Sequence, residues 1–369
     1  SENATLNQIV MKGRRVVFLL DGPIYLVAIC RTNEPDMYLR RQLHYLKLQI
    51  LQLLSGQIYK MLEKRPNYDF RHLMSDIRRF VEGLLDLASD SPHILCESFS
   101  YLPLQRTHRS QIERVLRKAK KISSSLLFGV LLCKSKVVAY VEPKGKGSVL
   151  PASDMILIIN FVRSSASLST ESAVHFTPVC LPTFNAGFMQ TYVGMLNKDL
   201  CVLLFSATND PSAAFPQLTK CKEAIDAEMK EYDLYDKIDK SLSERSITRI
   251  EEMKIPGLVH FVYIFRKRSQ HFSPTIHGAW NDENSKKRIW KRYKEVYCRF
   301  YETLSSEPHQ HICDRNDIET LVCTRGENYE LLAYVMFECV SITHLLLTYY
   351  KTTQVFRAVG RCRVCIEEM

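Results

Sequence analysis

The sequence lacks most of the features that mark membrane, secreted or fibrous proteins. Its 369 residues include only 13 glycines and 14 prolines, too few for a collagen-like or low-complexity chain. Apolar runs such as residues 126–133 fall far short of the roughly 20 residues that cross a bilayer. The first six residues carry neither the basic nor the apolar stretch of a signal peptide. We therefore expect a soluble, intracellular, globular chain.

Motifs for catalysis and cofactor binding are also missing. The sequence has no phosphate-binding Gly-x-x-x-x-Gly-Lys-Ser/Thr loop, no dinucleotide-binding glycine pattern and no nucleophile elbow. Twelve cysteines are scattered along the chain, many in apolar surroundings typical of buried thiols. Cys362 and Cys365 could form half of a zinc site with His309, His311 and Cys313, but a second Cys-x-x-Cys is absent. We expect no metal, no cofactor and no bond-making active site.

Positive charge is abundant. Fifty lysines and arginines against 40 acidic residues give a formal net charge of +10 and a pI near 8.9. Nucleic acid, an anionic membrane or an acidic protein would each suit such a charge. The basic residues are dispersed, apart from groups such as the basic helix expected over residues 108–121, and no nucleic-acid-binding signature is present. We therefore expect no nucleic-acid partner.

Hydrophobic periodicity predicts three successive α/β cycles. In the first, strands at residues 16–20 and 24–30 flank an Asp21-Gly22-Pro23 turn and precede helices over residues 35–64 and 69–88. The second has strands at 126–133, 137–141, 177–180, 188–195 and 200–206, with helices at 151–162 and 211–242. The third has strands at 258–266, 270–276, 318–325 and 330–337, with helices at 282–304 and 341–357. Tight turns between strands indicate antiparallel sheets flanked by helices, in three tandem α/β domains.

Five stretches carry a family resemblance. They are residues 22–32 (GPIYLVAICRT), 39–43 (LRRQL), 80–87 (FVEGLLDL), 101–104 (YLPL) and 177–185 (TPVCLPTFN). Together they resemble the SAND family, the Mon subunits of the Mon–Ccz complex, over about residues 16–340. The resemblance implies three longin domains, each a five-stranded antiparallel sheet with helices on its faces. It places the first domain at residues 1–92, a linker with the basic helix at 93–122, the second domain at 123–247 and the third at 248–369.

The chain departs from the family at both ends. Family members carry two strands and a helix of the first longin domain ahead of the Gly-Pro hairpin, whereas only residues 1–15 precede the first expected strand here. We therefore expect a first domain that is incomplete at its N-terminus. The tail after about Phe337 also departs from the family pattern.

The resemblance implies a function in membrane traffic. Paired with a Ccz-type longin subunit, the chain would form a guanine-nucleotide exchange factor for a late-endosomal Rab-type GTPase, in endosome maturation and vacuole or lysosome fusion. It would act in the cytoplasm, peripherally on the late endosome, vacuole or lysosome membrane. Exchange requires preferential binding of one GTPase conformation rather than a catalytic group. The alternative is a longin scaffold or tether without exchange activity.

Two sets of residues are candidates for these contacts. The GTPase- or partner-facing set follows the first hairpin and comprises Arg31, Asn33, Glu34, Arg40, Arg41 and His44, for which a solvated helix face is the alternative. The set expected to bind anionic, phosphoinositide-rich membrane comprises Lys144, Lys146, Arg266, Lys267, Arg268, Lys286, Lys287, Arg288, Lys291 and Arg292. Trp290 lies within the second set, although its apolar helix face favours a core role.

Overall fold

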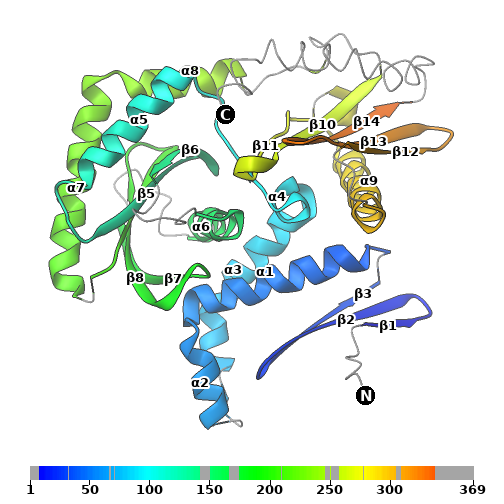
Figure 1. Ribbon diagram of the computed structural model, residues 1–369, viewed down its shortest axis with the longest axis horizontal. Coiled ribbons are helices and arrows are strands. Elements are labelled where there is room, and N and C mark those ends of the chain that lie inside the picture. The colour runs from blue at the N-terminus through cyan, green and yellow to red at the C-terminus, as the bar shows by residue number, and fades with distance from the viewer. Residues whose placement is uncertain are drawn as a thin grey trace.

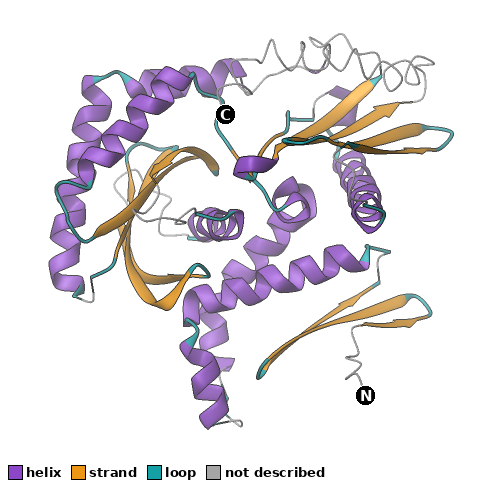
Figure 2. Cartoon of the chain, in the orientation of Figure 1, coloured by secondary structure: helices purple, strands orange, loops and turns teal. Residues whose placement is uncertain are grey.

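The computed structural model describes residues 8–336 except 32, 66–67, 70, 142–149, 166–173, 209, 246–249, 251–256, 277 and 305–308. These residues form three sheets, of three, five and six strands, with helices packed between and around them (Figures 1 and 2). The predicted α/β fold, with mainly antiparallel sheets and flanking helices, is confirmed.

The first sheet is a three-stranded antiparallel meander in the order β1-β2-β3. Its strands are β1 (Gln8–Met11), β2 (Arg14–Asp21) and β3 (Ile24–Cys30). Helices α1 (Asp36–Leu54), α2 (Gln57–Lys64), α3 (Arg71–Asp90) and α4 (Pro92–Cys96) follow. The prediction of a single helix over residues 35–64 is therefore wrong. Ser55 adopts a φ of 58°, which ends α1 before α2 begins. Gly22, at φ 56°, makes the predicted β2–β3 turn.

The second sheet has five antiparallel strands in the order β6-β5-β9-β8-β7. They are β5 (Leu126–Cys133), β6 (Lys136–Val141), β7 (Val174–Leu181), β8 (Phe184–Met195) and β9 (Leu200–Ser206). The associated helices are α5 (Arg106–Ala119), α6 (Ala152–Ser164), α7 (Pro211–Glu231) and α8 (Leu234–Arg245). Alternate residues of β9 belong to two separate cores, one shared with α6 and the other with α5 and α7. Both faces of this sheet are thus covered.

The third sheet has the order β12-β13-β14-β10-β11-β4. Its strands are β4 (Phe99–Ser100), β10 (Leu258–Phe265), β11 (Gln270–Phe272), β12 (Gln310–Arg315), β13 (Glu319–Arg325) and β14 (Tyr329–Met336). The 3-10 helices η3 (Arg266–Arg268) and η4 (Gly278–Trp280) precede the long helix α9 (Glu283–Glu302). Helix α9 packs across β12, β13 and β14, and contributes Tyr293 and Tyr297 to the core.

The segment expected to be a linker joins the second and third sheets. Strand β4 pairs in parallel with β11, and the next residue, Tyr101, forms a parallel bridge with Val137 of β6. The Leu102 N–H donates to the Val137 carbonyl oxygen at 2.8 Å. These backbone bonds place two sheets that are distant in sequence on either side of residues 99–102.

Helices α1 and α3 pack on the second region through α6. Residues 154–161 of α6 are all buried, the pattern of a helix with partners on every side. At its contact with α1 and α3, the Asn160 side-chain amide donates to Gln49 Oε1 at 2.6 Å and to the Phe80 carbonyl at 2.8 Å. Helix α1 also separates the first sheet from the rest of the molecule (Figure 1).

Candidate functional site: the open face of the first sheet

One face of the first sheet is packed against α1. On that face Val17 pairs with Ala28, and Leu19 pairs with Leu26 across β2 and β3. These side chains contact Leu39 and other apolar residues of α1 in a small core. The alternation of a strand sends the intervening side chains to the opposite face.

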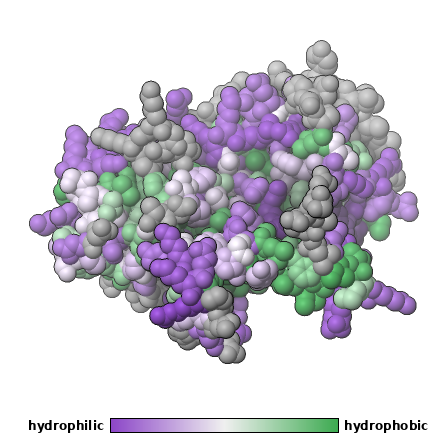
Figure 3. Space-filling model, turned by 60° about the horizontal axis from the view of Figure 1, so that its bottom comes forward, coloured by the Kyte–Doolittle hydropathy of each residue, from purple (hydrophilic) through white to green (hydrophobic). Residues whose placement is uncertain are grey.

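The opposite face, which we call the open face, is apolar and exposed. Tyr25, Val27 and Ile29 of β3 are 67%, 49% and 69% exposed. Strand pairing places them beside apolar residues of β2, and these in turn beside β1. The apolar residues of the open face are Ile9, Met11, Val16, Phe18, Leu20, Tyr25, Val27 and Ile29, and Arg14 lies on the same face opposite Met11. Figure 3 shows a large hydrophobic patch in this part of the molecule, at the lower right.

The edge of the first sheet beside the open face is also uncovered. Among the described strands, β3 pairs only with β2, so its outer edge offers backbone donors and acceptors to a further strand. Contiguous apolar patches rimmed by polar residues mark interaction sites on soluble proteins. An apolar face next to an available strand edge can bind another protein by side-chain packing and backbone hydrogen bonding together.

The predicted partner-facing residues nearest β3 have two different environments. Arg31 and Asn33 are exposed just beyond the strand. Glu34 instead holds the first region to the third, because its carboxylate lies 2.8 Å from the Lys294 ammonium of α9. Lys294 Nζ also lies 4.7 Å from the centre of the Tyr38 ring. Glu34 therefore has a structural role in this chain.

The predicted residues on α1 lie on the covered side of the sheet. Arg40 pairs with Asp36 at 2.6 Å, and Arg41 donates to the Leu95 carbonyl and pairs with Glu97 at 3.2 Å. His44 is exposed, with a pKa lowered by partial desolvation and by the neighbouring Lys47 charge. The six predicted contacts thus do not form one surface, and their role at an interface stays a prediction.

Several of the predicted membrane-binding cations make internal contacts. Arg266 lies 3.5 Å from the Glu330 carboxylate and donates to the Glu327 carbonyl at 3.1 Å, whereas Lys267 and Arg268 are exposed. Lys144 and Lys146 lie outside the described residues.

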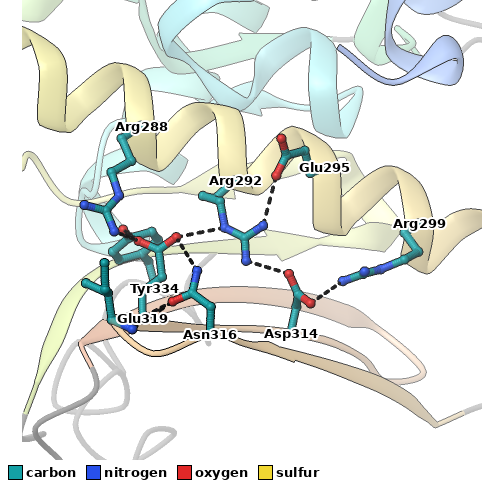
Figure 4. A network of polar contacts seen from close by, with 9 residues as sticks. Arg288, Arg292, Glu295, Arg299, Asp314, Asn316, Glu319 and Tyr334 are labelled. Carbon is teal, nitrogen blue, oxygen red and sulfur yellow. Dashed lines mark hydrogen bonds and ion pairs between the residues drawn. The ribbon is translucent and has the colours of Figure 1, made fainter. Parts of the chain in front are cut away.

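Arg288 and Arg292 on α9 belong to an ion network on the third sheet (Figure 4). Both guanidinium groups donate to Glu319, at 2.6 and 2.9 Å, and Arg292 also pairs with Asp314 at 2.5 Å. Burial opposes ionisation of Glu319, yet the Tyr334 hydroxyl and the Arg288 charge hold its pKa below the usual range. These two arginines therefore neutralise carboxylates within the fold.

The other cations at the start of α9 remain available. Lys287 and Lys291 are exposed and make no ion pair within the described part of the chain, and Lys286 is half-buried. Trp290 is only 6% exposed and packs edge-on against His260, so the expected core role is confirmed.

Three histidines are buried where α4 meets the third sheet and in that sheet itself. His93 lies on α4, His260 on β10 and His271 on β11. The His93 and His271 rings meet edge to face with centroids 4.7 Å apart, and Ser98 Oγ lies 2.9 Å from His271 Nδ1. Burial lowers the pKa of His93 to about 3 and that of His260 to about 4, and it lowers the pKa of His271 well below normal. All three are neutral at physiological pH.

The described residues contain neither a cluster suited to a metal ion nor a helix suited to crossing a membrane. Within them, no cluster of three or more His, Cys, Asp or Glu side chains could hold a metal ion. Cys362 and Cys365 lie outside the described residues. No described helix combines the length and apolar character that crossing a bilayer requires.

The open face was not among the residues predicted from sequence. Its signal is present, however: β3 reads Ile-Tyr-Leu-Val-Ala-Ile-Cys, apolar at every position. Strands covered on one face normally alternate apolar and polar residues, whereas a continuous apolar run is typical of strands covered on both. The pattern alone does not identify a site, because only the structure shows which face the described residues leave uncovered.

Comparison with known proteins places this architecture in a family. Residues 1–84 match the first, and residues 124–225 the second, longin domain of FUZ, MON1 and HPS1. The chain is 29% identical over 335 residues to vacuolar fusion protein MON1 homolog A of Gallus gallus, covering 90% of this chain and 59% of that protein. For the Homo sapiens MON1 homolog A the identity is 30% over 339 residues, covering 91% and 49%. The Arabidopsis thaliana MON1 homolog is 28% identical over 355 residues, covering 89% and 57%.

The fold and these matches define a longin-domain protein. Within that class, the chain belongs to the family of the proteins named MON1 and SAND, as the sequence motifs predicted. It spans about half to three fifths of the length of the relatives quoted above, which are 49% to 59% covered.

Proposed function

We propose that this chain is one subunit of a heterodimeric guanine-nucleotide exchange factor for a late-endosomal Rab-type GTPase, and that its open face docks the second, Ccz-type longin subunit. Its relatives are named vacuolar fusion proteins, which agrees with a role in endosome maturation and fusion with the vacuole or lysosome. The chain would act peripherally at those membranes.

The observation that carries this proposal is the open face itself. Burying a large apolar side chain that is otherwise exposed stabilises a complex by about 1.5–3 kcal/mol before the costs of association. Tyr25, Val27 and Ile29 are each about half exposed or more, so a partner covering them gains several such contributions. The free edge of β3 would add backbone hydrogen bonds and fix the partner's orientation.

Exchange would follow from differential binding. A factor that binds the nucleotide-free GTPase more tightly than the nucleotide-bound form shifts the equilibrium toward release by that difference in affinity. No proton transfer or covalent step is required of either subunit. Arg31 and Asn33, exposed at the end of β3, lie where a GTPase held beside the paired subunits could make polar contacts.

Release of a fluorescent guanine nucleotide from the GTPase tests the proposal. We expect fast release when both the chain and a Ccz-type subunit are present, and basal release with either one alone. Arg31→Glu should slow release while leaving the heterodimer intact, because Arg31 lies outside the open face. The matched control Arg65→Glu is an exposed arginine at the end of α2 and should leave the rate unchanged. Fast release by this chain alone would contradict a composite site.

A scaffold or tether without exchange activity is the second candidate. The open face supports a scaffold as well as it supports an exchange factor, because docking a partner does not by itself require exchange activity. A stable heterodimer that leaves nucleotide release at the basal rate would favour this candidate over the exchange factor.

Membrane attachment is a separate part of the proposal. The exposed cations Lys267, Arg268, Lys287 and Lys291 are available for anionic lipid, each with a gain of about 1 kcal/mol near the surface. We expect K287E/K291E to weaken binding to phosphoinositide-containing vesicles more than tenfold. The control K198E/K220E replaces two exposed lysines on other elements, and it changes the net charge by the same amount. Equal binding by both variants would contradict attachment through α9.

A further inference from the structure

Helix α5 and the turn that follows it form one of the two most basic segments of the chain, the other being the first half of α9. Residues 106–121 contain seven lysines and arginines and a single carboxylate, Glu113, a net charge of +6. The whole chain carries +10. None of these residues belongs to the open face or to the basic positions of η3 and α9.

Part of this charge is committed to the fold. Arg109 is only 4% exposed, donates to the Leu102 carbonyl at 2.9 Å and lies over the Tyr101 ring. Lys118 pairs with Glu228 of α7 at 2.9 Å, and the Lys120 ammonium donates to the Leu127 carbonyl. These contacts hold α5 to its neighbours.

The remaining cations form a line on the solvent side of α5. This line, which we call the α5 stripe, comprises Arg106, Ser110, Arg114, Arg117 and Lys121, all exposed. Within α5, the spacing of four, four and three residues keeps Arg106, Ser110, Arg114 and Arg117 within an arc of about 80° at the helical 100° per residue, and Lys121 lies in the turn just past the helix. Ile112, Val115 and Leu116 face the opposite way, into the second core.

The stripe is largely unneutralised. Arg117 pairs with Glu113 at 2.9 Å, but its side chain remains 59% exposed. Arg106, Arg114 and Lys121 make no ion pair within the described part of the chain. Four cations therefore lie along about 22 Å of helix, at 1.5 Å per residue.

The surroundings of the stripe favour a narrow ligand over a broad one. Helix α7 lies beside α5, and α7 and α8 together carry seven carboxylates and six basic residues. A flat anionic membrane resting on α5 would also meet exposed carboxylates of α7, such as Glu223 and Glu231. An extended peptide of about seven residues spans 22 Å and can follow the stripe without touching them.

We propose that the α5 stripe binds an acidic peptide segment of a partner protein. Carboxylates of that segment would pair with Arg106, Arg114, Arg117 and Lys121 in sequence along the helix. Arginine's planar fork can engage a carboxylate with two parallel hydrogen bonds, which gives the contact direction as well as attraction. Such a surface speeds association and loses affinity as salt rises. The stripe would act independently of the open face.

Fluorescence anisotropy with a labelled peptide of alternating glutamate and serine, about 12 residues long, tests this at low ionic strength. We expect R106E/R114E/K121E to lower peptide affinity at least about tenfold. These three cations make no internal ion pair, so the variant should keep the melting temperature of the parent chain. The control K60E/K64E/K198E makes the same charge change at exposed lysines away from α5 and should retain affinity within about twofold.

Three results would overturn the proposal. The parent chain could fail to bind the peptide at low salt. Both triple variants could lose affinity equally, which would show a response to net charge alone. The stripe variant could lose binding to phosphatidylserine vesicles or duplex DNA while its peptide affinity stays unchanged, which would assign the stripe to a different anion.

Discussion

Strands β3 and β9 are alike in length and apolar character and have very different surroundings. Both are seven residues long, and each is apolar at nearly every position: Ile-Tyr-Leu-Val-Ala-Ile-Cys in β3 and Leu-Cys-Val-Leu-Leu-Phe-Ser in β9. Every residue of β9 is buried, because α6 covers one face of its sheet and α5 and α7 cover the other. In β3 every second residue is exposed, because α1 and α2 cover only one face of its sheet within the described part of the chain.

The difference indicates that the apolar pattern of β3 suits a partner that the described residues do not supply. A strand selected for one covered face would alternate apolar with polar side chains. Strand β9 also lies between β5 and β8, whereas β3 has one neighbour among the described strands. In the second sheet, helices and strands of the same chain cover the corresponding face and edge. In the first sheet, the described residues leave both exposed.

The largest expected effect is a difference in unfolding free energy between alanine substitutions in the two strands. Leu204→Ala removes a side chain that is 1% exposed in β9 and should cost about 2–5 kcal/mol. Val27→Ala changes a side chain that is 49% exposed on the open face and should cost within about 0.5 kcal/mol in the isolated chain. Urea unfolding of both variants measures the contrast. A comparable loss for Val27→Ala would mean that the open face is covered within the chain.

A smaller effect probes how the helices of the first region join the second. A Cβ added at Gly83 of α3 would lie 2.2 Å from Ser164 Oγ and 2.9 Å from Asn160 Oδ1 on α6. Gly83→Ala should therefore destabilise the chain by about 1–3 kcal/mol. Gly187→Ala is the control, because a Cβ there meets nothing within 4 Å. Equal melting temperatures for the two variants would contradict a close α3–α6 contact.

The pH dependence of stability should come from the third region rather than the first sheet. Strands β1–β3 contain no histidine, whereas His93, His260 and His271 are buried and have lowered pKa values in the folded state. The unfolded chain takes up protons first as pH falls, so stability present above about pH 6.5 is lost below it. Each histidine should cost about 1.4 kcal/mol at pH 5.5.

Thermal unfolding between pH 7.5 and 5 checks this expectation. His93→Gln should reduce the loss of stability at pH 5.5 by about 1.4 kcal/mol, since it removes one of the titrating groups. The positive charge of Arg163 lowers the pKa of His93, and that of Lys136 lowers the pKa of His271. Neutralising either residue should therefore raise the pKa of the corresponding histidine slightly. A melting temperature that is constant over this range would contradict neutral buried histidines.

Much of the fold could be predicted because the strongly periodic segments dominate it. The β2–β3 hairpin, strand β9 and helices α6 and α9 were predicted within a few residues of their observed bounds. Two long helices were each predicted as one and are in fact broken. Ser55 and Asp233 adopt positive φ at the breaks, which apolar periodicity does not report.

The short strands were missed for a related reason. Strand β4 is two residues long and exists only because β11 lies beside it, and β12 (Gln-His-Ile-Cys-Asp-Arg) carries too little apolar pattern to be read as a strand. Tertiary pairing outweighs local propensity in both.

The candidate site was less predictable than the fold. Composition identified basic residues, but only the coordinates show that Arg288 and Arg292 neutralise Glu319, or that Arg41 is held by Glu97. Conversely, the sequence marks Tyr25 and Ile29 only as ordinary strand residues, and the structure shows that the described residues leave their face exposed. Charge partners and uncovered faces are long-range properties, so a local pattern could not assign them.

The central claim is that the open face docks the second longin subunit, and calorimetric titration of the chain with a Ccz-type subunit tests it most directly. Y25D/I29D should weaken the heterodimer at least about 100-fold, because two carboxylates would be buried against apolar surface. Ile318→Asp, at a residue that is 51% exposed and far from the first sheet in sequence, is the control and should leave the affinity unchanged. A heterodimer of undiminished affinity with Y25D/I29D would contradict the account.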